Sequence, residues 1–239
     1  VRKAFSLAID RTYIVNQVTQ SGQVEAGGFV PSGVYDADGA DGDDFRTVGG
    51  DYYKPTDADY EANCDEARQL LADAGYPNGE GFPVVEYLYN TSDAHKAVAE
   101  ALQFMWEEEL GVKVTLNNQE WAAFLQTRKD GDYSIARNGW IADYNDPISF
   151  LDMWMTGGGN NDAQYANDDY DALIKQAKTT TDNAERMDLL HQAEDKLIGE
   201  DSVLAPLYFY TQKYMLADGI EGMYYCPLGY FFFGYTHQA

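Results

Sequence analysis

The segment DYSIARNGWIADYNDP, residues 132–147, carries an arginine and an aspartate in a run with strand-like alternation. This alternation predicts a β-strand over residues 132–143, with Arg137 and Asp143 on one face. The two lie six positions apart, at most about 20 Å along an extended strand, which is too far for a direct ion pair. Gly139 between them leaves room for another molecule to approach the backbone. Each charge therefore needs another partner, either an ordinary neighbour or a ligand with separated opposite charges.

A second arginine occupies an apolar position on a neighbouring predicted helix. In WAAFLQTRK, residues 121–129, the side chains spaced for one helical stripe are Trp121, Phe124, Leu125 and Arg128. A charge on an apolar stripe is costly unless it is paired. Arg128 therefore also needs a carboxylate, from the protein or from a ligand.

A histidine adds a third basic group. If Ser92 caps the helix that follows, His95 lies in its first turn, where free N–H groups and the helix dipole favour an anion. A neutral imidazole can still donate one hydrogen bond there. Three groups suited to a carboxylate and one isolated carboxylate suited to an ammonium describe a receptor for a zwitterion. Pairing of the same side chains with ordinary neighbours is the alternative.

Motifs for other chemistry are missing from the sequence. No GxSxG elbow or HExxH motif occurs, and NGEGFP lacks the lysine of a phosphate-binding loop. The acidic loop at residues 36–45 fails the EF-hand pattern, because its fifth position is Ala40 and its sixth is Asp41. His191 is expected on the polar surface of a helix. We therefore expect no enzyme, no cofactor and no metal site.

Composition limits the class of protein. The chain has 239 residues, 45% of them hydrophobic and 23% charged, which is typical of a globular protein. Its net charge of -24 argues against nucleic acid as a partner, since phosphate backbones require a basic face. Cys64 and Cys226 lack zinc-ligand spacing, and either a disulfide between them or two free thiols remain open. No apolar run reaches the roughly 20 residues that span a bilayer.

Alternating helices and strands predict an α/β domain with a mixed sheet covered by helices. Residues 21–59 have little periodicity and predict a long irregular excursion, and Asp182 with Glu185 predicts a capping box. The predicted helices are 3–19, 64–75, the run after Ser92 to Leu110, 121–129, 168–178 and 183–198; the predicted strands are 84–90, 112–116 and 132–143.

The C-terminal stretch has a different character. SVLAPLYFY and MYYCPLGYFFFGY are rich in aromatic residues and poor in charge. Such a tail forms either core strands or a surface that packs against another body.

Five stretches, in order along most of the chain, carry a resemblance to a known family. They are VRKAFSLAIDR, ARQLLADAGYPNGEGFP, YNTSDAHKAVAEALQFMW, LGVKVTLNNQEWAAFLQTRKDGDYSIARNGWIADYNDPISFL and AEDKLIGEDSVLAPLYFY. The chain resembles the oligopeptide-binding (OppA-like) family of extracellular solute-binding proteins of ABC transporters. The resemblance implies a periplasmic-binding-protein type II-like (class C) lobe, which binds extended peptides partly through backbone hydrogen bonds.

The resemblance also implies roles for individual residues. Asp143 would be a desolvated anion that holds the α-ammonium group of a peptide, and His95, Arg128 and Arg137 would hold its carboxylate. Trp140 and Ile141 would border side-chain pockets. The alternatives are a different ligand on the same scaffold (nickel chelate, heme or an oligosaccharide) and a peptidase.

The family pattern further implies how the chain is organised. Because VRKAFSLAIDR lies well inside such proteins, we expect a piece of a longer parent. Residues 1–210 would be its second, C-terminal lobe, and residues 211–239 would normally pack on the missing first lobe. Partners would be short peptides, ABC-transporter permease subunits and that N-terminal lobe. The location would be extracellular or periplasmic, with the parent a lipoprotein or secreted. Peptide binding by one lobe alone is expected to be weak or undetectable.

Overall fold

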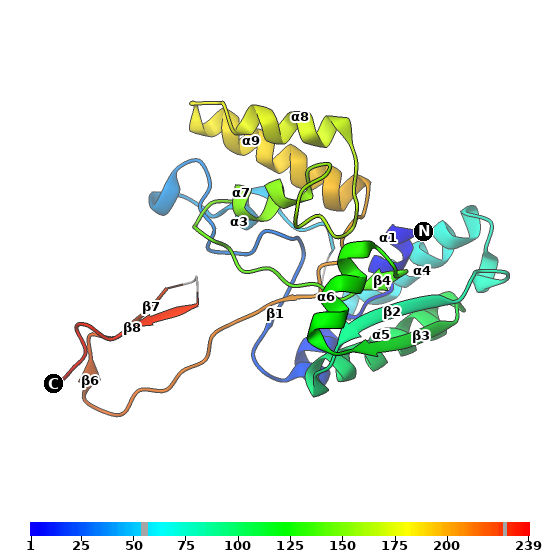
Figure 1. Cartoon of the computed structure of the whole chain (residues 1–239), viewed down its shortest axis with the longest axis horizontal. Helices are drawn as coiled ribbons and strands as arrows, with labels where there is room; N and C mark the ends of the chain where they lie inside the picture. Colours follow the sequence, from blue (N-terminus) through cyan, green and yellow to red (C-terminus); the bar gives the residue numbers. More distant parts are fainter. Residues whose placement is uncertain (54–56, 227–228) are drawn as a thin grey trace.

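The computed structural model describes residues 1–53, 57–226 and 229–239. A three-stranded parallel sheet forms the centre of the part drawn in cyan and green in Figure 1. Its order is β3 (Val114–Gln119), β2 (Val85–Asn90) and β4 (Ile135–Ala136). β2 and β3 pair along their whole length, whereas β4 contributes only two residues. The α/β class is confirmed. The strands of this sheet are all parallel, and the antiparallel pairing that was expected within a mixed sheet occurs in separate two-stranded pairs.

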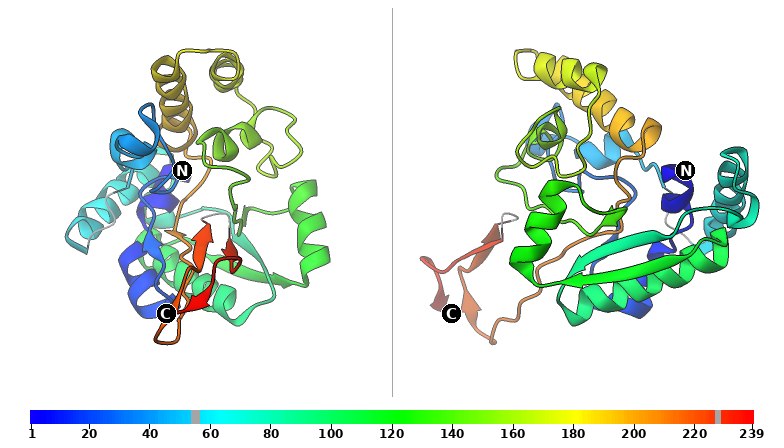
Figure 2. Two further views of the ribbon diagram at one scale, coloured as in Figure 1. Left: turned by 90° about the vertical axis from the view of Figure 1, so that its left-hand side faces the viewer. Right: turned by 45° about the vertical axis from the view of Figure 1, so that its right-hand side comes forward.

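Helix α5 (Asp93–Leu110) packs against β2 and β3 (Figure 2). Its start and end agree with the sequence: the Ser92 side chain accepts from the His95 amide, and Gly111 adopts a left-handed φ of 67°. The predicted inward stripe is confirmed as buried, and it consists of Val98, Leu102, Met105, Trp106 and Leu110. Burial of this apolar face drives the helix onto the sheet.

The N-terminal segment is not the single helix predicted over residues 3–19. It consists of α1 (Arg2–Leu7), α2 (Arg11–Tyr13) and a π-helix (Ile14–Thr19). The break comes from Asp10, whose carboxylate accepts a hydrogen bond from the Tyr13 amide at 2.8 Å and so begins a new helix.

The following region is largely irregular, as predicted for residues 21–59. It contains β1 (Val24–Glu25), a 3₁₀ turn (Gly39–Asp41) and α3 (Phe45–Gly49), and β1 pairs with β5 (Tyr208–Phe209). Residues 54–56 lie outside the described part. Helix α4 (Asp57–Asp73) begins earlier than the predicted residue 64. A 3₁₀ turn at Pro77–Gly79 then leads to β2.

Only Ile135–Ala136 of the segment predicted as a strand over residues 132–143 forms a strand, so the prediction is wrong for residues 132–134 and 137–143. The Arg137 amide still donates to the Leu88 carbonyl at 2.8 Å. Asn138 then accepts a hydrogen bond from the Gly139 amide, and the Asp143 amide donates to the Ser149 hydroxyl at 2.9 Å. The chain therefore leaves the sheet to bond with Ser149 in α7 (Ile148–Leu151), and its side chains do not alternate across one strand face.

A helical layer lies beside the sheet. It comprises α3, α7, a 3₁₀ turn (Asp152–Trp154), α8 (Asp168–Ala177), α9 (Asn183–Glu194) and a π-helix (Asp195–Glu200). Helix α6 (Trp121–Asp130) lies between this layer and the sheet (Figure 1). One half of the predicted capping box of α9 is confirmed, since the Asp182 side chain accepts a hydrogen bond from the Glu185 amide.

His191 does not lie on the polar surface as predicted. Its Nε2 is 2.7 Å from Asp36 Oδ2, its side chain is only 16% exposed, and its ring stacks on Phe45. The irregular segment around Asp36 folds back over α9, and this covering could not be inferred from helical spacing alone.

The C-terminal residues form two antiparallel pairs outside the core. β6 (Ile220–Glu221) pairs with β9 (His237–Gln238), and β7 (Tyr224–Cys226) pairs with β8 (Tyr230–Phe232). Figure 1 shows this tail extending away from the helices and the sheet. Several of its large side chains are exposed, including Met215, Tyr230, Phe233 and Tyr235. The packing of residues 211–239 on another lobe remains a prediction.

Among the helices of the described residues, none has the length and the apolar character that a membrane span requires.

Candidate functional site

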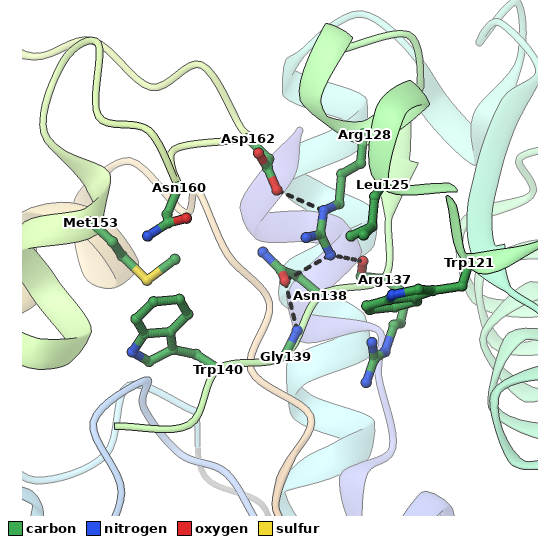
Figure 3. Close-up of a pocket in the computed structure, with 10 residues that line it drawn as sticks. All are labelled: Trp121, Leu125, Arg128, Arg137, Asn138, Gly139, Trp140, Met153, Asn160 and Asp162. Carbon is green, nitrogen blue, oxygen red and sulfur yellow. Dashed lines mark hydrogen bonds and ion pairs between the residues drawn. The ribbon is translucent and has the colours of Figure 1, made fainter. Parts of the chain in front are cut away.

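A cavity of about 200 Å³ opens between α6, the segment that follows β4 and the loop after Trp154 (Figure 3). Two arginines and one aspartate are its charged side chains. Its lining residues are Trp121, Leu125, Arg128, Arg137, Asn138, Gly139, Trp140, Met153, Asn160 and Asp162. Three of the predicted site residues, Arg128, Arg137 and Trp140, therefore meet in one place.

Arg128 already has a carboxylate partner in the protein. Its Nε donates to Asp162 Oδ2 at 2.7 Å, and the two side chains are 13% and 14% exposed. Its Nη1 donates to Asn138 Oδ1 at 2.9 Å. Asp162 thus neutralises Arg128, which is the pairing with an ordinary neighbour that the sequence left open as the alternative. The binding of a ligand carboxylate by Arg128 remains only a prediction.

Arg137 is different. Within the described residues no carboxylate lies within ion-pair distance of its guanidinium, whose Nη2 is 3.4 Å from the Tyr210 hydroxyl. In Figure 3 the Arg128 guanidinium points toward Asp162 and Asn138, whereas that of Arg137 points away from both. A half-buried guanidinium without an anion is suited to an incoming carboxylate.

His95 lies within the electrostatic reach of Arg137. Its pKa is held below the ordinary value, first by burial and then by the positive charge of Arg137, while a backbone hydrogen bond at Asn90 acts in the opposite direction. Its Nδ1 is buried without a hydrogen-bond partner. Burial also raises the pKa of the neighbouring Tyr87, and the charge of Arg137 acts to lower it.

Asp143 and Ile141 continue along the same segment but do not line the cavity. Both are exposed, Ile141 by 70%. Asp143 is therefore exposed rather than desolvated in this structure, and its desolvation on ligand binding remains a prediction. Its carboxylate has no hydrogen bond or ion pair with a described residue, so it remains available to a cation.

The sequence did not single out Asp162, Asn160, Asn138 or Met153 as site residues. Asp162 and Asn160 lie in a loop with little regular structure, and Met153 lies in a 3₁₀ turn. Trp121 and Leu125 were predicted as an inward stripe, yet they are partly exposed and face the cavity. The signal available in the sequence was Arg128 on the same helical stripe as Trp121 and Leu125, since a charge on such a stripe indicates that the stripe is not simply core.

The remaining sequence-based candidates lie elsewhere. Cys64 is buried and Cys226 is partly buried, and both are free thiols. Burial raises the pKa of Cys64 to about 11. Within the described ranges no three metal-ligating side chains come together.

Comparison with known proteins gives consistent matches. Residues 1–162 match the family model described as bacterial extracellular solute-binding proteins, family 5 Middle. The dipeptide-binding protein DppE of Bacillus subtilis is 38% identical over 96% of this chain, and the periplasmic oligopeptide-binding protein OppA of Salmonella typhimurium is 37% identical over 93%. The chain spans 40% and 38% of the length of these relatives.

A solved structure shows the same fold. Haemophilus influenzae OppA in complex with the peptide RPPGFSPFR superimposes with a TM-score of 0.77 at 30% identity, over 93% of this chain and 41% of that protein. The expected periplasmic-binding-protein type II-like architecture is therefore confirmed.

Proposed function

Since the chain belongs to the bacterial extracellular solute-binding proteins of family 5, we propose that it forms part of the peptide-capturing component of an ABC importer. It would bind short peptides without cleaving them, outside the cytoplasmic membrane, and pass them to permease subunits. Its relatives named above are binding proteins for dipeptides and oligopeptides.

One observation carries the proposal: a single segment presents a cation and an anion, each without a counter-ion among the described residues. Arg137 lines the cavity, and Asp143 follows six positions later on an exposed turn. Arg137, with His95 beside it, would hold the carboxylate of a peptide, and Asp143 would hold its α-ammonium group. The charged ends of an extended peptide of three to five residues lie about 10–18 Å apart, so two separate groups are needed to bind them.

Trp140 and Ile141 lie between the two charges and would border the side chains of the peptide. Trp140 is fixed, because its indole N–H donates to the Ser149 carbonyl at 2.7 Å. Ile141 is exposed and would become covered only when a ligand or another lobe packs on it. Water in loosely shaped pockets would allow different peptide side chains to bind.

The division of the chain is part of the proposal. Residues 1–210 would act as one lobe, and the exposed aromatic residues of 211–239 would pack on the remainder of a longer parent. Closure of two lobes on the peptide would exclude water and desolvate Asp143.

Native mass spectrometry of the full-length parent, as purified from its host, tests this function. We expect a mixture of short peptides that is released on denaturation. A nickel chelate, heme or an oligosaccharide in place of peptides would contradict the proposal. Incubation with a peptide library would reveal cleavage if the protein were a peptidase.

A further inference from the structure

The charges inside the cavity do not balance. Its lining contains two guanidinium groups, those of Arg128 and Arg137, and one carboxylate, that of Asp162. Asp162 is bound to Arg128 at 2.7 Å, and both side chains are largely covered. The cavity therefore presents one uncompensated positive charge rather than two.

Asp162 is held in place by its neighbours, although its loop lacks regular structure. The buried amide of Asn161 donates to the carbonyls of Met155 and Tyr165, at 3.0 and 2.8 Å, and accepts from the Tyr165 amide. The Tyr133 hydroxyl donates to the Asp162 carbonyl at 2.7 Å. This network fixes the loop against α6, so the carboxylate stays beside Arg128.

Arg128 is equally constrained. Its guanidinium lies 5.0 Å from the centre of the Phe124 ring, and its Nη1 bonds to Asn138. These contacts orient the Arg128–Asp162 pair along one wall of the cavity, and Figure 3 shows Arg137 turned away from it. Arg128 is thus neutralised within the protein, and Arg137 is left for a ligand.

We propose that Asp162 is a specificity-determining residue of this cavity. By neutralising Arg128, it limits the cavity to ligands that bring one carboxylate to Arg137 and disfavours those that bring a second carboxylate close to the first. The inference rests on the proposed peptide-binding function and adds to it a selection against an acidic residue at the C-terminal end of the peptide.

The size of the effect follows from Coulomb's law. Two unit charges about 4 Å apart interact by about 1 kcal/mol in water and by more where water is partly excluded. Removal of the Asp162 charge would therefore strengthen the binding of a second ligand carboxylate by about fivefold or more.

The test compares Ala-Ala-Glu with its neutral counterpart Ala-Ala-Gln on the 239-residue chain. Both are titrated to millimolar concentrations at low ionic strength and followed by NMR. For Asp162→Asn we expect the ratio of the two affinities to shift toward Ala-Ala-Glu by about fivefold. The double variant Arg128→Gln/Asp162→Asn removes both charges and should restore the ratio of the unmodified chain, which a merely structural role of Asp162 would not explain.

The charge of the cavity has its own reporters. Trp121 and Trp140 line it, whereas Trp106 and Trp154 are each 2% exposed. Iodide is an anion, so its quenching of tryptophan fluorescence should increase in Asp162→Asn, where the cavity is more positive. In the double variant the quenching should return to the level of the unmodified chain. Quenching by neutral acrylamide should stay the same in all three proteins.

The outcomes separate the two claims. If both tripeptides bind and Asp162→Asn leaves their ratio and the iodide quenching unchanged, the role of Asp162 is overturned and the proposed function stands. If neither tripeptide binds to any of the three proteins at millimolar concentration, the inference about Asp162 is overturned, whereas the proposed function, which requires both lobes, is decided by the peptides found in the full-length parent.

Discussion

Arg128 and Arg137 line the same cavity, but only Arg128 has a carboxylate partner within ion-pair distance among the described residues. The difference comes from the loop that carries Asp162, which reaches Arg128 and not Arg137. Two arginines that look equivalent in the sequence therefore have different electrostatic environments. Arg137 is the one that a ligand carboxylate would stabilise.

Replacement of Asp143 by asparagine should weaken the binding of a tripeptide with a free amino terminus. The carboxylate is exposed in this structure, so the loss is expected to be modest, about 0.2–1 kcal/mol or up to about fivefold in affinity. Titration of Ala-Ala-Ala against the chain, followed by NMR, measures it.

The control for Asp143→Asn is Asp188→Asn, which removes the same charge from an exposed position on α9. It should leave the affinity within error of the unmodified chain. Equal losses in the two variants would show that Asp143 acts only through net charge and does not contact the ligand.

The binding of a carboxylate should raise the pKa of His95. In the free chain this pKa is lowered by burial and by the positive charge of Arg137. An anion placed between the two side chains offsets that charge and favours the imidazolium. Because the bound form then takes up a proton, the affinity should increase as the pH falls through the interval between the free and the bound pKa.

NMR titration of the His95 ring resonances, with and without Ala-Ala-Ala, checks this change. The C-terminal amide of the same peptide lacks the carboxylate and should leave the His95 titration unaltered. A downward movement of the pKa on addition of the free peptide would contradict the account.

Glu194 should be essential for stability. Its fully buried Oε1 accepts hydrogen bonds from the amides of Phe29 and Val30 and from Arg46 Nη1, at 2.8 to 2.9 Å. Glu194→Ala would leave a buried guanidinium and two amides without this partner, at a cost of about 3–5 kcal/mol in the free energy of unfolding. Urea denaturation measures the change.

A matched control lies a few residues further along the chain. Glu200 forms an exposed pair with Lys196 at 3.0 Å. Glu200→Ala should change the free energy of unfolding by less than about 1 kcal/mol. If Glu194→Ala were as stable as this control, the buried pair would not hold the irregular N-terminal segment on α9.

The two cysteines should differ in reactivity. Cys64 is buried with a pKa raised to about 11, so it stays protonated at pH 8, whereas Cys226 is partly exposed. Reaction with a thiol reagent at pH 8 should modify one thiol rapidly and the second only on unfolding, and Cys226→Ser should abolish the rapid phase. Rapid modification of both thiols would contradict this assignment.

The sequence predicted the elements whose periodicity is strong. Helix α5 and strand β2 lie where Ser92, Gly111 and the apolar spacing placed them. Prediction from the sequence failed where hydrogen bonds of individual side chains, rather than apolar spacing, decide the path of the backbone. Asp10 divides the first helix, and Asn138 with Ser149 draws residues 138–143 away from the sheet.

The candidate site was also predictable only in part. Residue types and the family resemblance led to Arg137, Arg128 and Trp140, which the cavity does bring together. Asp162 could not be identified, because its position depends on an irregular loop that is folded by the hydrogen bonds of Asn161. A long-range ion pair of this kind leaves no periodic signal in a sequence.

The most direct measurement compares Ala-Ala-Ala with its N-acetylated, C-amidated form on the ¹⁵N-labelled chain, and repeats the comparison with Arg137→Gln. We expect the free tripeptide to perturb the Arg137 Nε–Hε resonance and the Asp143 amide, the blocked form to have little effect, and Arg137→Gln to lower the affinity for the free form by about tenfold. Equal binding of the free and blocked tripeptides, or shifts confined to other parts of the chain, would contradict the capture of a peptide by its two charged ends.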